Sequence, residues 1–281
     1  MSFLALLITL ALSLAWDYGR TLHRDDWYRR WRGQTSSLGL RGVPAVLLQV
    51  GLPVVAVQLL LRELEPLLFG LAWIAAATLL LLYSLGRGRL SAESEKYRSQ
   101  CRRGDFEGAL LYAQQSLGLG GQTPSLDSQP EVHRVLQTSF LYQAQQRWFA
   151  VLFYFLLLGP AGALAYRLLY LAAEEEPAAA RLLTYVDWVP GRLMAAAFTV
   201  TGNFVESADE LAAGLLQAGM RTPAFLYSVA MAATGEDRVA VPDEGFGVFA
   251  ARQNEAFMGL LRRSGTCWVV VIALLELLRQ G

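Results

Sequence analysis

The chain has 281 residues, of which 54% are hydrophobic and 17% are charged. Charged residues make up about a quarter of an average soluble domain, so this composition argues against an ordinary soluble protein. The 24 basic and 24 acidic residues cancel, and this balance predicts no nucleic-acid partner. Two cysteines and two histidines at unrelated positions predict neither a disulfide framework nor a metal site, and we expect no cofactor.

The apolar residues are concentrated in blocks, and about 20 helical residues are needed to cross a hydrocarbon core. The blocks cover residues 3–16, 43–61, 66–85, 148–172 and 265–278. The second, third and fourth are long enough to span a membrane, whereas the first and last are shorter. No basic segment precedes the first block and no small-residue cleavage site follows it, so we interpret it as a retained helix rather than a signal peptide.

Arginines accumulate in the polar segments, which places these segments in the cytoplasm and the amino terminus outside. Residues 17–42 carry such an arginine excess, with Trp27, Tyr28 and Trp31 interspersed as in an interfacial helix whose rings lie among lipid headgroups. Only Arg62 to Glu65 separate the second and third blocks. This spacing predicts a tight helical hairpin with a periplasmic tip.

The polar stretch after residue 85 is a second predicted cytoplasmic loop. Residues 106–113 are amphipathic, residues 118–129 indicate a flexible turn, and a helix restarts at Pro130 and runs toward Trp148. His23 and His133 each lie alone in a loop, where we expect them to be solvated.

The fourth block contains Gly159, Pro160 and Gly162 near its middle. Such residues are consistent with one kinked span or with a re-entrant hairpin. We prefer the kinked span, which makes the acidic run 174–176 periplasmic and requires residues 189–204 to cross back. The hairpin requires no such crossing.

Catalytic motifs are missing from the sequence. The single lysine, Lys96, follows Glu95 and cannot belong to a phosphate-binding loop, and Gly202 and Ser207 do not form a nucleophile elbow. We therefore predict no catalytic residue and expect binding rather than catalysis. Glu206, Asp209 and Glu210 share a helical face, which we interpret as a solvated acidic face rather than a cation site.

Several polar side chains lie in apolar surroundings, where an ionisable group is costly unless it is paired or hydrated. Asp187 and Arg192 flank Pro190 and Gly191, so they could form an ion pair that fixes a helix start and anchors it at the interface. The alternative is a polar pocket that meets a ligand. Its candidate ligand-binding residues are Arg167, Asp187, Arg192, Asn203 and Glu206.

Three features resemble the AmpE family, membrane proteins encoded beside the anhydromuramyl amidase of peptidoglycan recycling. They are the amino-terminal helix with its arginine-rich loop, the segment VDWVPGRL at 186–193, and the segment SGTCWVVVIAL at 264–274. The resemblance covers nearly the whole chain. It implies an inner-membrane regulator or signal transducer in β-lactamase induction.

A more distant resemblance is to the membrane enzymes of cobalamin biosynthesis that attach aminopropanol or its phosphate to a corrinoid. Residues 153–166 carry it, together with Asp187, Pro190, Arg192 and Leu193. The acidic stretch of those enzymes is replaced here by residues 143–147, and their His-Pro motifs are missing. The resemblance thus implies a shared membrane core without the amide-forming reaction.

We therefore predict an all-α, polytopic helical membrane protein of the bacterial inner membrane, with about five or six membrane-embedded segments and partly helical cytoplasmic loops. The predicted regions are an N-terminal membrane region 1–85, a loop 86–147, a central membrane region 148–204, a loop 205–263 and a membrane helix 264–281. The expected function is modulation of β-lactamase induction by binding a peptidoglycan-derived small molecule or a protein partner. A membrane enzyme related to the cobalamin synthases and a muropeptide transporter are the alternatives.

Overall fold

The computed structural model describes residues 2–15, 25–85, 90–117, 128–217, 219–235 and 245–280. Over these residues the chain is helical and contains no strand, as predicted. It divides into two compact units. Unit 1 comprises Met1–Arg87 and Gln146–Trp188, and unit 2 comprises Gly88–Gln145 and Val189–Gly281.

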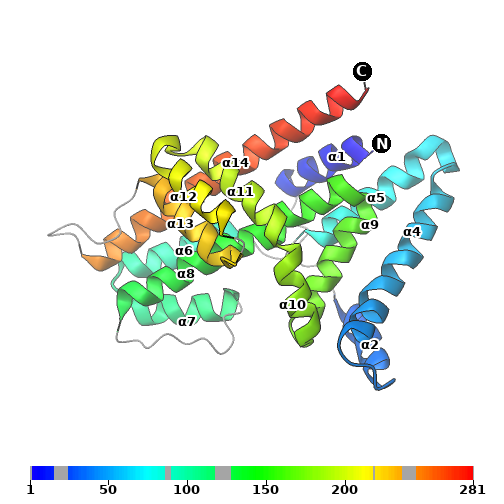
Figure 1. Ribbon diagram of the computed structural model, residues 1–281, viewed down its shortest axis with the longest axis horizontal. Coiled ribbons are helices and arrows are strands. Elements are labelled where there is room, and N and C mark those ends of the chain that lie inside the picture. The colour runs from blue at the N-terminus through cyan, green and yellow to red at the C-terminus, as the bar shows by residue number, and fades with distance from the viewer. Residues whose placement is uncertain are drawn as a thin grey trace. The chain divides into compact units, whose positions relative to one another are not determined.

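Unit 1 contains the first four predicted apolar blocks. Its elements are α1 (Ser2–Ala15), α2 (Asp26–Ser36), α3 (Val43–Val46), the π-helical turn η2 (Leu47–Gly51), α4 (Leu52–Leu64), the 3₁₀ turn η3 (Leu67–Gly70), α5 (Leu71–Ser84), α9 (Ala150–Ala172) and α10 (Pro177–Val186). Helix α5 packs against α1 and α9. Helices α4 and α5 form the predicted hairpin, in which the left-handed Gly70 starts α5 (Figure 1).

The predicted helix in the first basic segment is α2, but one of its faces is buried in protein. Tyr28 donates to the Leu168 carbonyl at 3.1 Å, and the Arg32 guanidinium donates to the Leu171 carbonyl at 3.0 Å. Both side chains are buried. The interfacial interpretation of Tyr28 was therefore wrong, because the second half of α9 supplies partners that the local sequence does not reveal. His23 lies outside the described residues.

Helix α9 is broken at Gly159, whose φ of 74° and ψ of −164° are not helical, and Pro160 starts its second half. Arg32 also forms an ion pair with Glu175, so the acidic run after α9 lies beside the basic segment that contains α2. If that segment is cytoplasmic, the acidic run is cytoplasmic as well. On that condition we expect the re-entrant hairpin in place of the kinked span that we preferred from the sequence.

Unit 2 is a helical assembly around a buried cluster of Tyr97, Cys101, Leu136 and Phe140. Its elements are α6 (Leu90–Arg102), α7 (Phe106–Leu117), α8 (Gln129–Ala144), α11 (Trp188–Thr201, whose first residue belongs to unit 1), α12 (Phe204–Leu216), α13 (Thr222–Thr234) and α14 (Phe246–Gln280). Helix α8 leads through the π-helical turn η4 (Gln145–Phe149) into α9. The predicted loop 86–147 is thus mostly helical where it is described. Residues 118–127 of the turn predicted at 118–129 lie outside the described residues, and Gln129 begins α8.

Three helices are long and apolar enough to cross a membrane: Val43–Leu64, Gln129–Ala172 and Phe246–Leu275. Phe3–Leu12 and Leu71–Ser84 are shorter apolar helices. Helix α14 runs without interruption through residue 264, where we predicted a loop to end and a membrane helix to begin (Figure 1). The chain therefore has the helices of a polytopic membrane protein.

Candidate functional site

A chain of buried polar side chains links α6, α8 and α14 in unit 2. The Tyr97 hydroxyl lies 2.6 Å from His133 Nδ1, and His133 Nε2 lies 2.8 Å from Gln253 Oε1. Because an amide oxygen can only accept, the proton of a neutral imidazole resides on Nε2, and Nδ1 accepts from the tyrosine. Burial also raises the pKa of the Tyr97 hydroxyl well above its usual range, so this group remains a donor.

The polar chain continues from α8 back to α6. Asn254 Nδ2 donates to Gln137 Oε1 at 3.0 Å, and the Ser94 hydroxyl donates to Asn254 Oδ1. All of these side chains are at most 3% exposed. Buried polar groups are tolerated only when they are paired, so the cluster fixes the register of the three helices.

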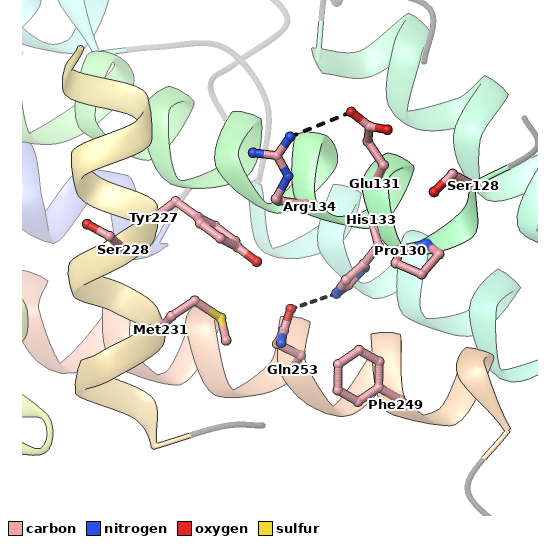
Figure 2. A pocket seen from close by; sticks show the side chains of 10 residues that line it. All are labelled: Ser128, Pro130, Glu131, His133, Arg134, Tyr227, Ser228, Met231, Phe249 and Gln253. Atoms are coloured by element: carbon pink, nitrogen blue, oxygen red, sulfur yellow. Dashed lines mark hydrogen bonds and ion pairs between the residues drawn. The ribbon is translucent and has the colours of Figure 1, made fainter. Parts of the chain in front are cut away.

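A pocket of about 520 Å³ lies beside this cluster, and His133 and Gln253 belong to both (Figure 2). Tyr227 and Phe249 give it aromatic walls. The side chains of Glu131 and Arg134 are more than half exposed and form a 3.7 Å ion pair at its edge. The residues that line it come from α8 with its N-cap Ser128, from α13 and from α14: Ser128, Pro130, Glu131, His133, Arg134, Tyr227, Ser228, Met231, Phe249 and Gln253.

The volume of the pocket lies within the range of small-molecule sites. Aromatic rings, hydroxyl groups and one amide line a space of the size that small-molecule sites occupy, roughly 300–1,000 Å³. The inner polar groups are neutral, and the charged pair is at the exposed edge. Within the described ranges, no group of three or more histidine, cysteine or acidic side chains is placed to hold a metal.

Two of the residues predicted to bind a ligand lie in unit 1. Asp187 is fully buried and accepts hydrogen bonds from Gln146 Nε2 at 2.9 Å and from the Tyr166 hydroxyl at 2.6 Å. Arg167 is buried as well, and its guanidinium lies 3.2 Å from a carboxylate oxygen of Asp25. Both side chains are therefore held by neighbours within unit 1.

The other three predicted residues lie in unit 2. Arg192 donates to the Thr222 hydroxyl at 3.3 Å and to the Met220 carbonyl at 3.1 Å, and it lies over the Phe225 ring. Asn203 is the N-cap of α12 and accepts from the backbone N–H of Glu206.

Asn203 and Glu206 are thus brought together as a helix cap. Arg167 with Asp187, in unit 1, and Arg192 with Asn203 and Glu206, in unit 2, belong to different compact units. The meeting of all five residues in one pocket stays a prediction.

His133 is the pocket residue whose surroundings the sequence analysis misjudged. We expected a solvated loop histidine, and its side chain is 3% exposed on α8. Val132, Leu136 and Phe140 share its buried face at spacings of three and four residues. This helical periodicity was a signal that the loop interpretation overlooked, and Gln137 falls on the same face.

The apolar helices define a helical membrane protein, and its unit 2 contains a ligand-sized pocket. The family model described as "Regulatory signalling modulator protein AmpE" matches residues 1–278. The chain therefore belongs to the AmpE family, as its sequence features indicated, and its role is regulatory. Neither the curated proteins nor the solved structures contain a match to this chain.

Proposed function

We propose that this protein modulates β-lactamase induction in connection with peptidoglycan recycling, as a multi-pass protein of the inner membrane. Membership of a family of regulatory signalling modulators is the observation that carries this proposal. The neutral, ligand-sized pocket of unit 2 supports a regulator that binds rather than catalyses.

The ligand that we propose for this pocket is a peptidoglycan-derived small molecule. Hydroxyl groups of Ser128, Ser228 and Tyr227 and the amide of Gln253 can exchange hydrogen bonds with sugar hydroxyls and peptide groups. The ring of Phe249 offers an apolar surface to a sugar or alkyl face. The Glu131–Arg134 pair at the edge can re-pair with the charged ends of a peptide.

Helix α14 gives this pocket a direct connection to a membrane segment. Phe249 and Gln253 line the pocket near its start, and Val270, Leu274 and Leu278 are exposed and apolar near its end. A ligand that binds more tightly to one position of α14 would increase the population of that position. Because α14 is continuous, its far end would move together with the pocket end. Binding would thus be transmitted to the bilayer or to a partner within it.

The role in induction is tested in a strain that lacks the protein. β-Lactamase activity is measured after exposure to an inducing β-lactam, with and without the wild-type chain restored at its normal membrane abundance. We expect an altered response in the deletion strain that the wild-type chain restores. An identical response in every strain would overturn the proposal.

The role of the pocket is tested in the same strain with Arg134→Ala. The matched control is Arg102→Ala, because Arg102 is another exposed arginine of unit 2 that pairs with a single exposed glutamate, Glu255, away from the pocket. Exposed pairs of this kind contribute about 0–1 kcal/mol, so neither change should unfold the protein. We expect an altered induction response only for Arg134→Ala.

A further inference from the structure

Unit 1 contains a second cavity, of about 370 Å³, at the tip of the α4–α5 hairpin. The broken point of α9 closes one side of it, because Leu158, Gly159 and Pro160 line the cavity together with α4 and α5. The remaining lining residues are Gln58, Leu61, Arg62, Glu65 and Trp73.

Two charged side chains of opposite sign, Arg62 and Glu65, line this cavity, and they form no ion pair with each other or with other described residues. No ion pair of Arg62 or Glu65 is found in the part of the chain that the structure describes, although the two are three positions apart at the end of α4. Both side chains are exposed. They are available to a ligand that carries both charges.

The surroundings of the cavity are those of a lipid-facing surface. Leu59, Leu60 and Leu158 are each at least 55% exposed, and Phe69 in the turn between α4 and α5 is fully exposed. Charged residues and tryptophan beside such an apolar surface are typical of the membrane–water interface. A ligand at this cavity would therefore have a polar end at Arg62 and apolar chains along α4.

We propose that this cavity binds the headgroup of a zwitterionic phospholipid that carries a primary ammonium group. The guanidinium of Arg62 takes the phosphate, and the carboxylate of Glu65 accepts hydrogen bonds from the ammonium group. The face of Trp73 adds a cation–π contact to the ammonium group. The acyl chains of the lipid lie along the exposed leucines.

The signs of the two charges select a zwitterionic lipid, and the hydrogen bonds that the Glu65 carboxylate accepts select a primary ammonium group. An anionic headgroup without an ammonium group gains from Arg62 but is repelled by Glu65. A free phosphate ion meets the same opposition and lacks acyl chains to cover Leu59 and Leu60. Only a headgroup with both charges satisfies both side chains at once.

The proposal is tested by native mass spectrometry of the full chain, released from detergent and titrated with single lipids. We expect bound phosphatidylethanolamine, weaker phosphatidylglycerol, and no retention of water-soluble phosphoethanolamine. Arg62→Gln and Glu65→Gln should each weaken phosphatidylethanolamine binding about tenfold, the effect of removing one charge-assisted hydrogen bond. Glu63→Gln is the matched control, because Glu63 is exposed on the same helix end but does not line the cavity.

Three results would overturn the proposal. Equal phosphatidylethanolamine binding by the wild type and both cavity variants would show that the lipid lies elsewhere. Preference for phosphatidylglycerol would remove the role of Glu65, and tight binding of phosphoethanolamine without acyl chains would make the cavity a site for soluble molecules. The melting temperature of each variant is measured alongside, and the single-charge changes at exposed positions are expected to leave it unchanged.

Discussion

Tyr154 and Tyr166 stack on one another, with ring centroids 5.4 Å apart and planes inclined by 15°. They are twelve positions apart in the chain, and a straight helix would place their Cα atoms about 18 Å apart. Helix α9 therefore bends sharply between them, at Gly159 and Pro160. The second half, from Pro160 to Ala172, is shorter than the roughly 20 residues that a span requires.

This bend predicts that the acidic run after α9 is on the cytoplasmic side. A cysteine introduced as Glu174→Cys, in a chain carrying Cys101→Ala and Cys267→Ala, should react with a membrane-impermeant maleimide only after permeabilisation of the cells. Glu63→Cys at the hairpin tip is the control and should react in intact cells. Labelling of position 174 from outside would restore the single kinked span.

The buried pair of Asp25 and Arg167 should matter far more to stability than the exposed pair of Arg32 and Glu175. Asp25→Asn leaves the buried guanidinium without its carboxylate, which costs about 3–5 kcal/mol. Glu175→Gln changes a side chain that is 68% exposed and should cost at most about 1 kcal/mol. Thermal unfolding in detergent, followed by tryptophan fluorescence, compares them, and equal melting temperatures would contradict the burial argument.

Asp187→Asn should destabilise unit 1 by about 1–3 kcal/mol. The two carboxylate oxygens accept from Gln146 and Tyr166, whereas an asparagine offers one oxygen and turns its amide nitrogen toward a donor. The same unfolding measurement checks this change, with the exposed Asp209→Asn as a control that should be neutral. A neutral Asp187→Asn would favour a role for this carboxylate in binding rather than in packing.

Cys101 should resist alkylation in the folded protein. Its side chain is 1% exposed, and burial raises the pKa of the thiol from 9.0 to about 11. At pH 8 this shift alone lowers the reactive thiolate fraction about a hundredfold. The rate of reaction with N-ethylmaleimide, measured in a Cys267→Ala chain before and after denaturation, should rise by at least that factor. Similar rates in both states would place Cys101 at the surface.

The sequence predicts the helices of this protein better than the tertiary contacts between them, because a helix is encoded by local apolar runs and spacing. The α4–α5 hairpin and the break at Gly159 were predictable from residues a few positions apart. The direction of the chain after that break was not, since it depends on the contact of Arg32 with residues about 140 positions away. The partners of Asp187 and Arg192 are likewise tertiary contacts.

The pocket of unit 2 shows the same limit. Its residues come from α8, α13 and α14, and nothing in the local sequence indicates that His133 would meet Gln253 across 120 positions. The periodicity of α8 could have predicted a buried histidine, but not the cavity beside it. The ion pair expected between Asp187 and Arg192 rested on proximity along the chain, and it stays a prediction because the boundary between the two compact units falls between these residues.

The most direct test of a regulatory ligand site is β-lactamase induction by an inducing β-lactam in a deletion strain complemented with Ser228→Phe. The introduced ring occupies part of the pocket, whereas Ala224→Phe places the same ring on an exposed position one turn earlier in α13. At equal membrane abundance, we predict that Ala224→Phe restores the wild-type response and Ser228→Phe does not. Full restoration by both variants would contradict a regulatory role for this pocket.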